Sequence, residues 1–91
     1  MDRIHLTQLA PVLGATADRL ATTSPSAAMS PAALHMGIQL SVWDRHGAYN
    51  TAAVGRDITR ALAATAELPL VGTCAQYAVR LRSYLQPNTH G

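Results

Sequence analysis

Residues 51–86, with the sequence TAAVGRDITRALAATAELPLVGTCAQYAVRLRSYLQ, form the longest periodic segment of the chain. Apolar residues recur every three or four positions in two stripes, which is typical of amphipathic helices. The first stripe comprises Val54, Ile58, Ala61 or Leu62, Thr65 and Leu68, and the second comprises Leu70 or Val71, Cys74, Tyr77, Leu81, and Tyr84 or Leu85. The stripes slip out of phase at Pro69, and a proline kinks or breaks a helix because it lacks a backbone donor. We therefore expect either one long C-terminal arm kinked at Pro69 or two helices, 51–68 and 70–86, before a tail at 87–91.

The N-terminal part of the chain predicts a further amphipathic helix over residues 4–22. Its apolar stripe has the same three-four spacing and comprises Leu6, Leu9, Leu13, Thr16 or Ala17, and Leu20. Residues 23–30 predict a loop, because Pro25 and several serines interrupt the periodicity. Ser30 followed by Pro31 is a typical helix start, since serine caps the free backbone N–H groups and proline fits the first helical position.

Residues 31–44 fit two patterns. Strict alternation with smaller or polar residues is a strand pattern, and it involves Leu34, Met36, Ile38, Leu40 and Val42. The same residues, together with Trp43, also cover one broad face of a helix, and the start signal at Ser30 favours the helix. A lone strand would have no pairing partner in a helical chain. We predict a helix here, with a short strand over 34–43 as the alternative, followed by a turn at 45–50.

These segments predict an all-α fold in a single domain covering residues 1–91, either a helical hairpin or a small antiparallel bundle of three or four helices. Gly47 is placed to end one helix and Asn50 to cap the next. Hydrophobic residues make up 48% of the chain and charged residues only 13%, whereas average domains carry about 25% charged residues. This composition suits helix–helix association, and a partner would add to the limited core of so short a chain.

The titratable residues give no indication of catalytic or metal-binding chemistry. The only close cluster is Asp44, Arg45 and His46, and a metal site there would need a third ligand, such as His35. An arginine between two ligands disfavours a cation, so we predict a polar turn, no metal, no cofactor and no catalytic residue. The single Cys74 lies in an apolar segment and is expected to be a buried thiol.

The net charge of +2 is small and the arginines are scattered along the chain, so nucleic-acid binding is not expected. The alternative function is nevertheless a small helical regulator, either an antitoxin or a nucleic-acid-binding protein. Helices on either side of Gly47 would then mimic a helix-turn-helix, with Arg56 and Arg60 one turn apart on the second helix. Asp57 lies beside these arginines, and no Asn or Gln accompanies them to contact bases.

Three landmarks of the chain resemble features of a known family. They are residues 4–10 (IHLTQLA) with 17–20 (ADRL), Trp43 followed by Arg45, and residues 58–68 (ITRALAATAEL) with 74–78 (CAQYA). In these features the sequence resembles the EspC-like and WXG-like small helical hairpin proteins associated with actinobacterial type VII secretion. The resemblance implies a long second helix whose end carries a tyrosine before the secretion motif.

The sequence departs from the family pattern at two points. The hairpin turn of the wider family contains Trp-any-Gly, whereas Gly47 stands four positions after Trp43. The export signal of the family is a tyrosine with an acidic residue four positions later, whereas Leu81 follows Tyr77 at that distance and Asn88 follows Tyr84. Tyr77 is therefore only a degenerate form of the export signal, and recognition by the secretion ATPase is not implied.

We expect a non-enzymatic interaction module that pairs with itself or with another helical hairpin, or with the N-terminal helical domain of a secreted effector. The side chains expected to contact the partner are Leu6, Leu9, Leu13, Leu20, Trp43, Val54, Ile58, Leu62, Tyr77 and Leu81. No stretch reaches the roughly 18 apolar residues of a membrane span, and the first residues lack the apolar core of a signal peptide. The expected location is the cytoplasm, with any export following a route that needs no cleaved signal.

Overall fold

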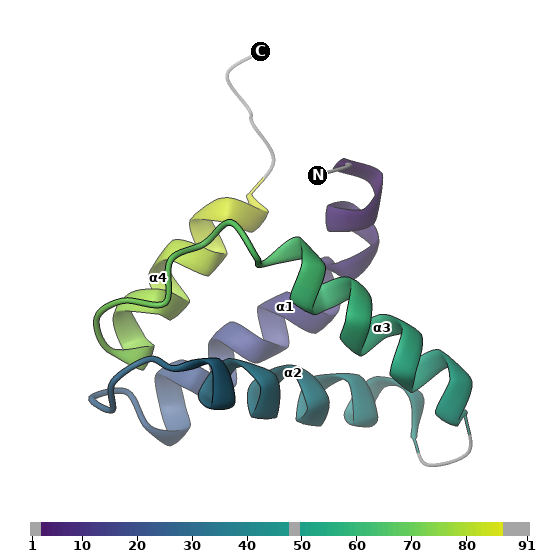
Figure 1. Cartoon of the computed structure of the whole chain (residues 1–91), viewed down its shortest axis with the longest axis horizontal. Helices are drawn as coiled ribbons and strands as arrows, with labels where there is room; N and C mark the ends of the chain where they lie inside the picture. Colours follow the sequence, from purple (N-terminus) through teal and green to yellow (C-terminus); the bar gives the residue numbers. More distant parts are fainter. Residues whose placement is uncertain (1–2, 48–49, 87–91) are drawn as a thin grey trace.

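The computed structural model describes residues 3–47 and 50–86, with side chains from residue 8 onward. This part of the chain contains no strand and four helices, which are α1 (Arg3–Thr23), α2 (Pro31–His46), α3 (Thr51–Ala64) and α4 (Cys74–Leu85) (Figure 1). The predicted all-α fold is confirmed, in the form of a small bundle. The alternative of a strand over 34–43 is wrong, because these residues lie within α2.

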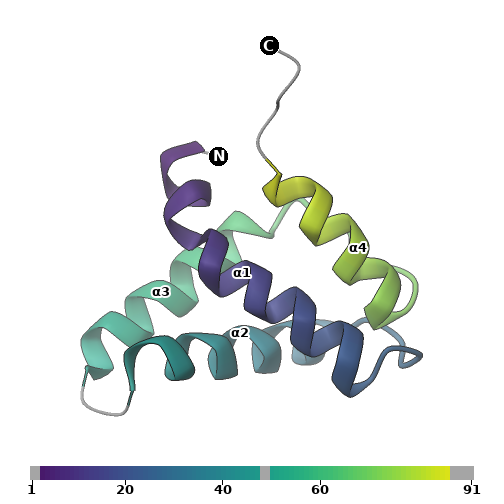
Figure 2. The same ribbon diagram turned by 180° about the vertical axis from the view of Figure 1, so that it is seen from behind.

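The helix α1 lies at the centre of the bundle. It contacts each of the other three helices, α2 and α3 contact each other, and α4 packs on no helix other than α1 within the described residues. Figures 1 and 2 show α2 along one edge of the molecule, with α3 and α4 rising from opposite ends of that edge. The molecule is flat, with extents of 36 × 34 × 18 Å.

The core is formed by the inner faces of all four helices. Its largest fully buried apolar side chains are Tyr77, Leu13, Ile38, Leu81, Val12 and Val42. The helix α3 adds smaller buried residues, Val54 and Ala61 among them. Burying one large apolar side chain stabilises a fold by roughly 1.5–3 kcal/mol, so the contact of α1 with α2 and α4 supplies most of the apolar stabilisation.

The helix α1 contains a proline, Pro11, in its interior. The ring of an internal proline clashes with the preceding turn and removes one backbone hydrogen bond, which bends a helix. Figures 1 and 2 show the first turns of α1 inclined to the remainder of the helix. The bend lets the following turns run straight along the core.

Capping residues fix the starts of α2 and α3 where the sequence predicts them. The Ser30 hydroxyl accepts a hydrogen bond from the Ala33 N–H at 3.1 Å, directly before Pro31. The Asn50 side-chain oxygen accepts one from the Ala53 N–H at 3.2 Å. The predicted end of α2 at residue 44 is two residues too early, because the helix continues to His46 before Gly47 ends it. Asp44, Arg45 and His46 thus form the last turn of α2, not an open loop.

The predicted C-terminal arm is two separate helices. The helix α3 ends at Ala64, residues 65–73 form a linker, and α4 begins at Cys74. The predicted helices 51–68 and 70–86 are therefore too long at the ends that face each other, and Pro69 lies in the linker and not at a kink. The linker moves the chain away from α3 and brings α4 back onto α1. The predicted tail at 87–91 lies outside the described residues.

The N-terminus of α4 is held by the loop between α1 and α2. The Cys74 N–H donates to the Ala27 carbonyl at 2.8 Å, and the Ala75 N–H donates to the Pro25 carbonyl at 3.0 Å. These carbonyls occupy two of the backbone donors that a helix leaves free at its first turn. The loop therefore stabilises the first turn of α4, a helix that contacts neither α2 nor α3.

A capping box completes the start of α4. The Thr73 hydroxyl accepts from the Gln76 N–H at 3.1 Å, and the Gln76 side-chain oxygen accepts from the Thr73 N–H at 2.9 Å. Gly72 precedes the box in a left-handed conformation with φ of 78°, and its carbonyl accepts from the Met29 N–H at 2.9 Å. Glycine adopts that conformation at little cost, so Gly72 permits the chain reversal that starts α4.

Candidate interaction surface

Six of the residues that were predicted to contact a partner are buried in the core. They are Leu9, Leu13, Leu20, Val54, Tyr77 and Leu81. The other three helices pack around α1, and the apolar stripes are buried against one another within one chain. A partner cannot reach these side chains while the bundle is closed, so we assign them to the fold.

The remaining predicted contacts differ in accessibility. Ile58 and Leu62 are partly buried and pack against the edge of the core. The side chain of Leu6 lies outside the described residues. Trp43 is the one member of the predicted set that is an exposed large apolar residue in the described structure.

Trp43 belongs to an exposed apolar stripe on α2, which we call the α2 stripe and define as Met36, Leu40 and Trp43. Their exposed fractions are 56%, 44% and 40%. Spacings of four and three residues place the three side chains on one face of the helix. That face lies opposite the one that buries Leu34, Ile38 and Val42. Met36 and Leu40 were absent from the predicted contacts, although their alternation with the buried residues was visible in the sequence.

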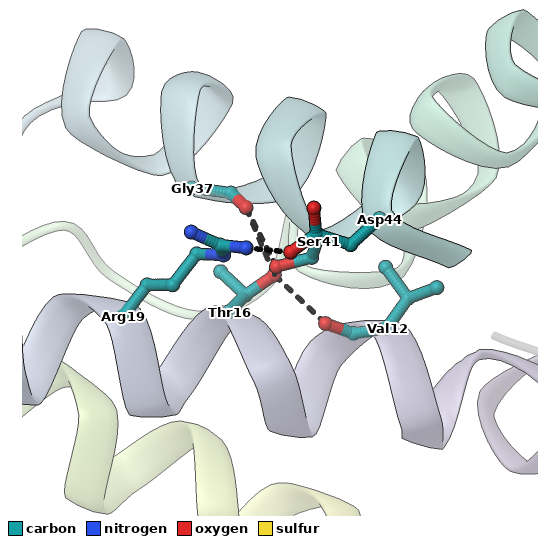
Figure 3. Close-up of polar contacts among 6 residues, drawn as sticks. All are labelled: Val12, Thr16, Arg19, Gly37, Ser41 and Asp44. Carbon is teal, nitrogen blue, oxygen red and sulfur yellow. Dashed lines mark hydrogen bonds and ion pairs between the residues drawn. The ribbon is translucent and has the colours of Figure 1, made fainter. Parts of the chain in front are cut away.

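A close polar contact between α1 and α2 sets the orientation of the α2 stripe (Figure 3). The buried Thr16 hydroxyl of α1 donates to the Val12 carbonyl at 2.9 Å and lies 3.2 Å from the Ser41 hydroxyl of α2. Ser41 in turn donates to the Gly37 carbonyl at 2.8 Å. A methyl group on Gly37 would lie 3.2 Å from Thr16 Cγ2, so only a small residue allows this approach. The inner face of α2 is thus fixed against α1, and the stripe faces outward.

Ion pairs join the ends of the helices around this contact. Arg19 of α1 pairs with Asp44 of α2 (Figure 3), and Arg82 of α4 pairs with Asp18 of α1. Both pairs are largely exposed, and exposed pairs stabilise a fold by only about 0.2–1 kcal/mol. His46 Nε2 lies 2.6 Å from a carboxylate oxygen of Asp57 in a more buried pair between α2 and α3. These pairs orient the helices more than they hold them together.

The cluster Asp44-Arg45-His46 does not form a metal site. The Asp44 side chain contacts Arg19, whereas the His46 side chain contacts Asp57 on α3. Among the described residues, no three His, Cys, Asp or Glu side chains lie close enough to hold a metal ion. The two candidate ligands therefore serve separate contacts between helices.

Tyr77, the residue that resembles an export-signal tyrosine, is fully buried in the core. Burial raises the pKa of its hydroxyl. The Tyr77 hydroxyl has no hydrogen-bond partner among the described residues. The Arg80 guanidinium lies 5.8 Å from the centre of the Tyr77 ring and donates to the Val71 carbonyl of the linker. A receptor cannot contact this tyrosine in the folded chain.

Two shallow hollows mark the surface of the described part of the chain. The first is lined by Pro11, Val12, Ala15, Ser41, Asp44 and Arg45. The second is mainly apolar and is lined by Pro31, Leu34, Leu62, Thr65, Ala66, Leu68, Pro69 and Leu70. The hydroxyls of Ser41 and Thr65 both donate to carbonyls of their own helices, so neither hollow presents a hydroxyl activated by a neighbouring base.

Comparison with protein-family models, with curated proteins and with solved structures found no match for this chain. In the part of the chain that the structure describes, the geometry defines a small all-α bundle with an exposed apolar stripe on α2. Within the described residues, no helix is both long enough and apolar enough to cross a membrane.

Proposed function

We propose that this chain is a non-enzymatic interaction module that binds another helical protein through the α2 stripe. The observation that carries the proposal is the exposure of Met36, Leu40 and Trp43 on a face opposite the core. Large apolar side chains gathered on one exposed face are typical of protein-binding sites. Tryptophan in particular is enriched among the residues that dominate binding energy.

The contacts of α2 support a binding role because they make this helix a rigid platform. Its N-terminus is capped by Ser30, its inner face is fixed to α1 through Gly37 and Ser41, and its last turn is joined to α3 through His46. A partner would therefore meet a preformed surface, which lowers the entropic cost of association.

The partner class that we propose is another helix-rich protein of the kind associated with type VII secretion. The support is the sequence resemblance at residues 4–20 and 58–78, together with an all-α fold. Because Tyr77 is buried, a secretion receptor cannot bind its export-like motif directly in the folded chain. We therefore propose that the module acts in the cytoplasm, with export, where it occurs, depending on a partner that carries its own signal.

A photo-crosslinking experiment tests this function. A photoreactive amino acid replaces Met36, and in a matched control it replaces Val79, which is 65% exposed on α4. After irradiation in cells of the source organism, we expect an adduct at position 36, mapped by mass spectrometry to a helix of the captured protein, and none at position 79. Equal labelling at both positions, or no adduct at position 36, contradicts the proposal.

A second candidate function is a nucleic-acid-binding regulator, and one observation favours it. Asp57 turns inward to His46, and Arg56 and Arg60 are exposed one helical turn apart on the same helix. The pair could contact phosphates, and binding would then weaken steeply with rising salt. A filter-binding titration of duplex DNA at two salt concentrations tests this function. If the chain does not bind DNA at low salt, nucleic-acid binding is excluded.

A further inference from the structure

The helix α3 fills its share of the core with small side chains. Its buried apolar residues are Ala53, Val54, Ala61 and Ala64. The larger side chains of α3, Ile58 and Leu62, are only partly buried at the edge of the core. Apolar stabilisation grows with the area removed from water. The helix α3 therefore gains less from burial than α1, α2 and α4, each of which buries at least two leucine, isoleucine or tyrosine side chains.

The backbone of α3 is also held only locally. Within the described residues, its hydrogen bonds outside the helix go to the residues that directly flank it, such as the bond from the Val54 N–H to the Asn50 carbonyl at 3.0 Å. In contrast, the Cys74 and Ala75 N–H groups at the start of α4 donate to the loop between α1 and α2. Although α4 packs on a single helix, it has backbone contacts with a distant segment that α3 lacks.

The boundary between α2 and α3 has one polar contact and one gap. Among the described residues, the side-chain hydrogen bond that joins α3 to another helix is the pair of His46 and Asp57, with 2.6 Å between Nε2 and the carboxylate oxygen. At the other end of α3, Leu62 and Leu34 of α2 line an apolar hollow. Close packing is thus incomplete where α3 leaves α2.

Removal of α3 would leave the rest of the bundle joined. The helix α1 packs on α2 and on α4 through contacts that do not involve α3. The helices α3 and α4 rise from opposite ends of α2 (Figures 1 and 2). A segment with few buried apolar contacts opens at a lower free-energy cost than the whole chain, and α3 is the segment of this bundle that meets that condition.

We infer that α3 opens as a unit while α1, α2 and α4 remain packed together. This opening depends on the packing of α3 alone and not on the proposed binding of a partner by the α2 stripe. In the open state, the sides of α1 and α2 that α3 covers reach solvent. A partner then meets an apolar surface that the closed bundle hides, so α3 acts as a removable cover of part of the core.

Native-state hydrogen exchange tests the opening directly. The slowest amides of α3 should exchange at least about tenfold faster than the slowest amides of α1 and α4, because they are released without unfolding of the whole chain. Urea below the unfolding transition should accelerate exchange in α3 less steeply than in α1 and α4, since a partial opening exposes less surface. Equal protection and equal urea dependence in the three helices would overturn the inference.

Two substitutions distinguish a partial opening from unfolding of the whole chain. Cys74→Ala removes a buried thiol from α4, which stays packed in the open state. It should accelerate exchange in α1 and α4 by about 5–30-fold, as loss of a core group does, and leave the amides of α3 unchanged. Val54→Ala on α3 should accelerate exchange in all three helices. If Cys74→Ala accelerates α3 as much as α1, then α3 opens only together with the whole chain.

Thiol labelling gives a second measurement that is independent of amide exchange. Cys74 is the single cysteine of the chain and is buried, so its labelling rate in the unmodified chain reports the core between α1 and α4. A variant with Val54→Cys and Cys74→Ala places the thiol on α3 instead. Under native conditions it should be labelled at least about tenfold faster than Cys74, and in concentrated urea at a similar rate. Circular dichroism checks that the variant is folded, and equal native rates contradict the opening of α3.

Discussion

Replacement of Gly72 by alanine should destabilise the fold strongly for a change of one methyl group. Gly72 has φ of 78°, and a residue with a side chain costs about 1–2 kcal/mol more than glycine in that conformation. The added methyl would also lie 2.3 Å from the Gln76 side-chain oxygen, which must then leave the Thr73 N–H. Loss of that hydrogen bond adds about 0.5–1.5 kcal/mol. We expect a total loss of about 1.5–3.5 kcal/mol.

The matched control for this variant is Gly55→Ala. Gly55 lies exposed within α3, and a methyl group there would meet no atom within 4 Å. Alanine is favoured over glycine inside helices by about 0.5–1 kcal/mol, so this variant should be more stable than the unmodified chain. Thermal unfolding followed by circular dichroism should give Gly72→Ala a melting temperature about 6–28 °C below that of the unmodified chain, since 1 kcal/mol shifts a domain of this size by about 4–8 °C. Equal melting temperatures for the two variants would refute the geometry described for the start of α4.

Four further substitutions test the two faces of α2 and the buried tyrosine. Ile38→Ala should lower the free energy of unfolding by about 2–5 kcal/mol, whereas Leu40→Ala should change it by no more than about 0.5 kcal/mol, both measured by urea denaturation of dilute protein. Gly37→Val should separate α1 from α2 at Thr16 and cost about 1–3 kcal/mol by the same assay. Because burial raises the pKa of Tyr77 above its ordinary value of 10.0, the unfolded chain releases this proton first, so stability is complete below about pH 10 and falls above it. Tyr77→Phe should reduce that fall, as urea denaturation at about pH 9 and about pH 11 would show.

Local signals allowed the sequence to predict where two helices start. Ser30 and Asn50 each cap the helix that follows through a contact three residues away, and such contacts depend only on nearby residues. The start of α4 also had a local signal, because Thr73 and Gln76 have the spacing of a capping box. The prediction placed that start near residue 70, since the apolar stripe continues through the linker without a break in its pattern.

Contacts between distant segments could not be predicted from the same sequence. The carbonyls of Pro25 and Ala27 hold the N-terminus of α4, and no local pattern links these residues to Cys74. The covering of the α1 stripe by three other helices is equally non-local. For that reason the apolar pattern at Leu9 and Leu13 does not distinguish contact with a partner from burial in the core of the same chain.

The ambiguity of residues 34–43 is explained by the two opposite apolar faces of α2. One face repeats every four residues and is buried through Leu34, Ile38 and Val42, and the other starts two residues later and is exposed at Met36 and Leu40. Two such repeats offset by two residues produce strict alternation, which is the pattern of a strand. A helix that served only the core would need polar residues on its outer face. The alternation that made a strand plausible is thus the trace, in the sequence itself, of the second apolar face that we propose as the binding surface.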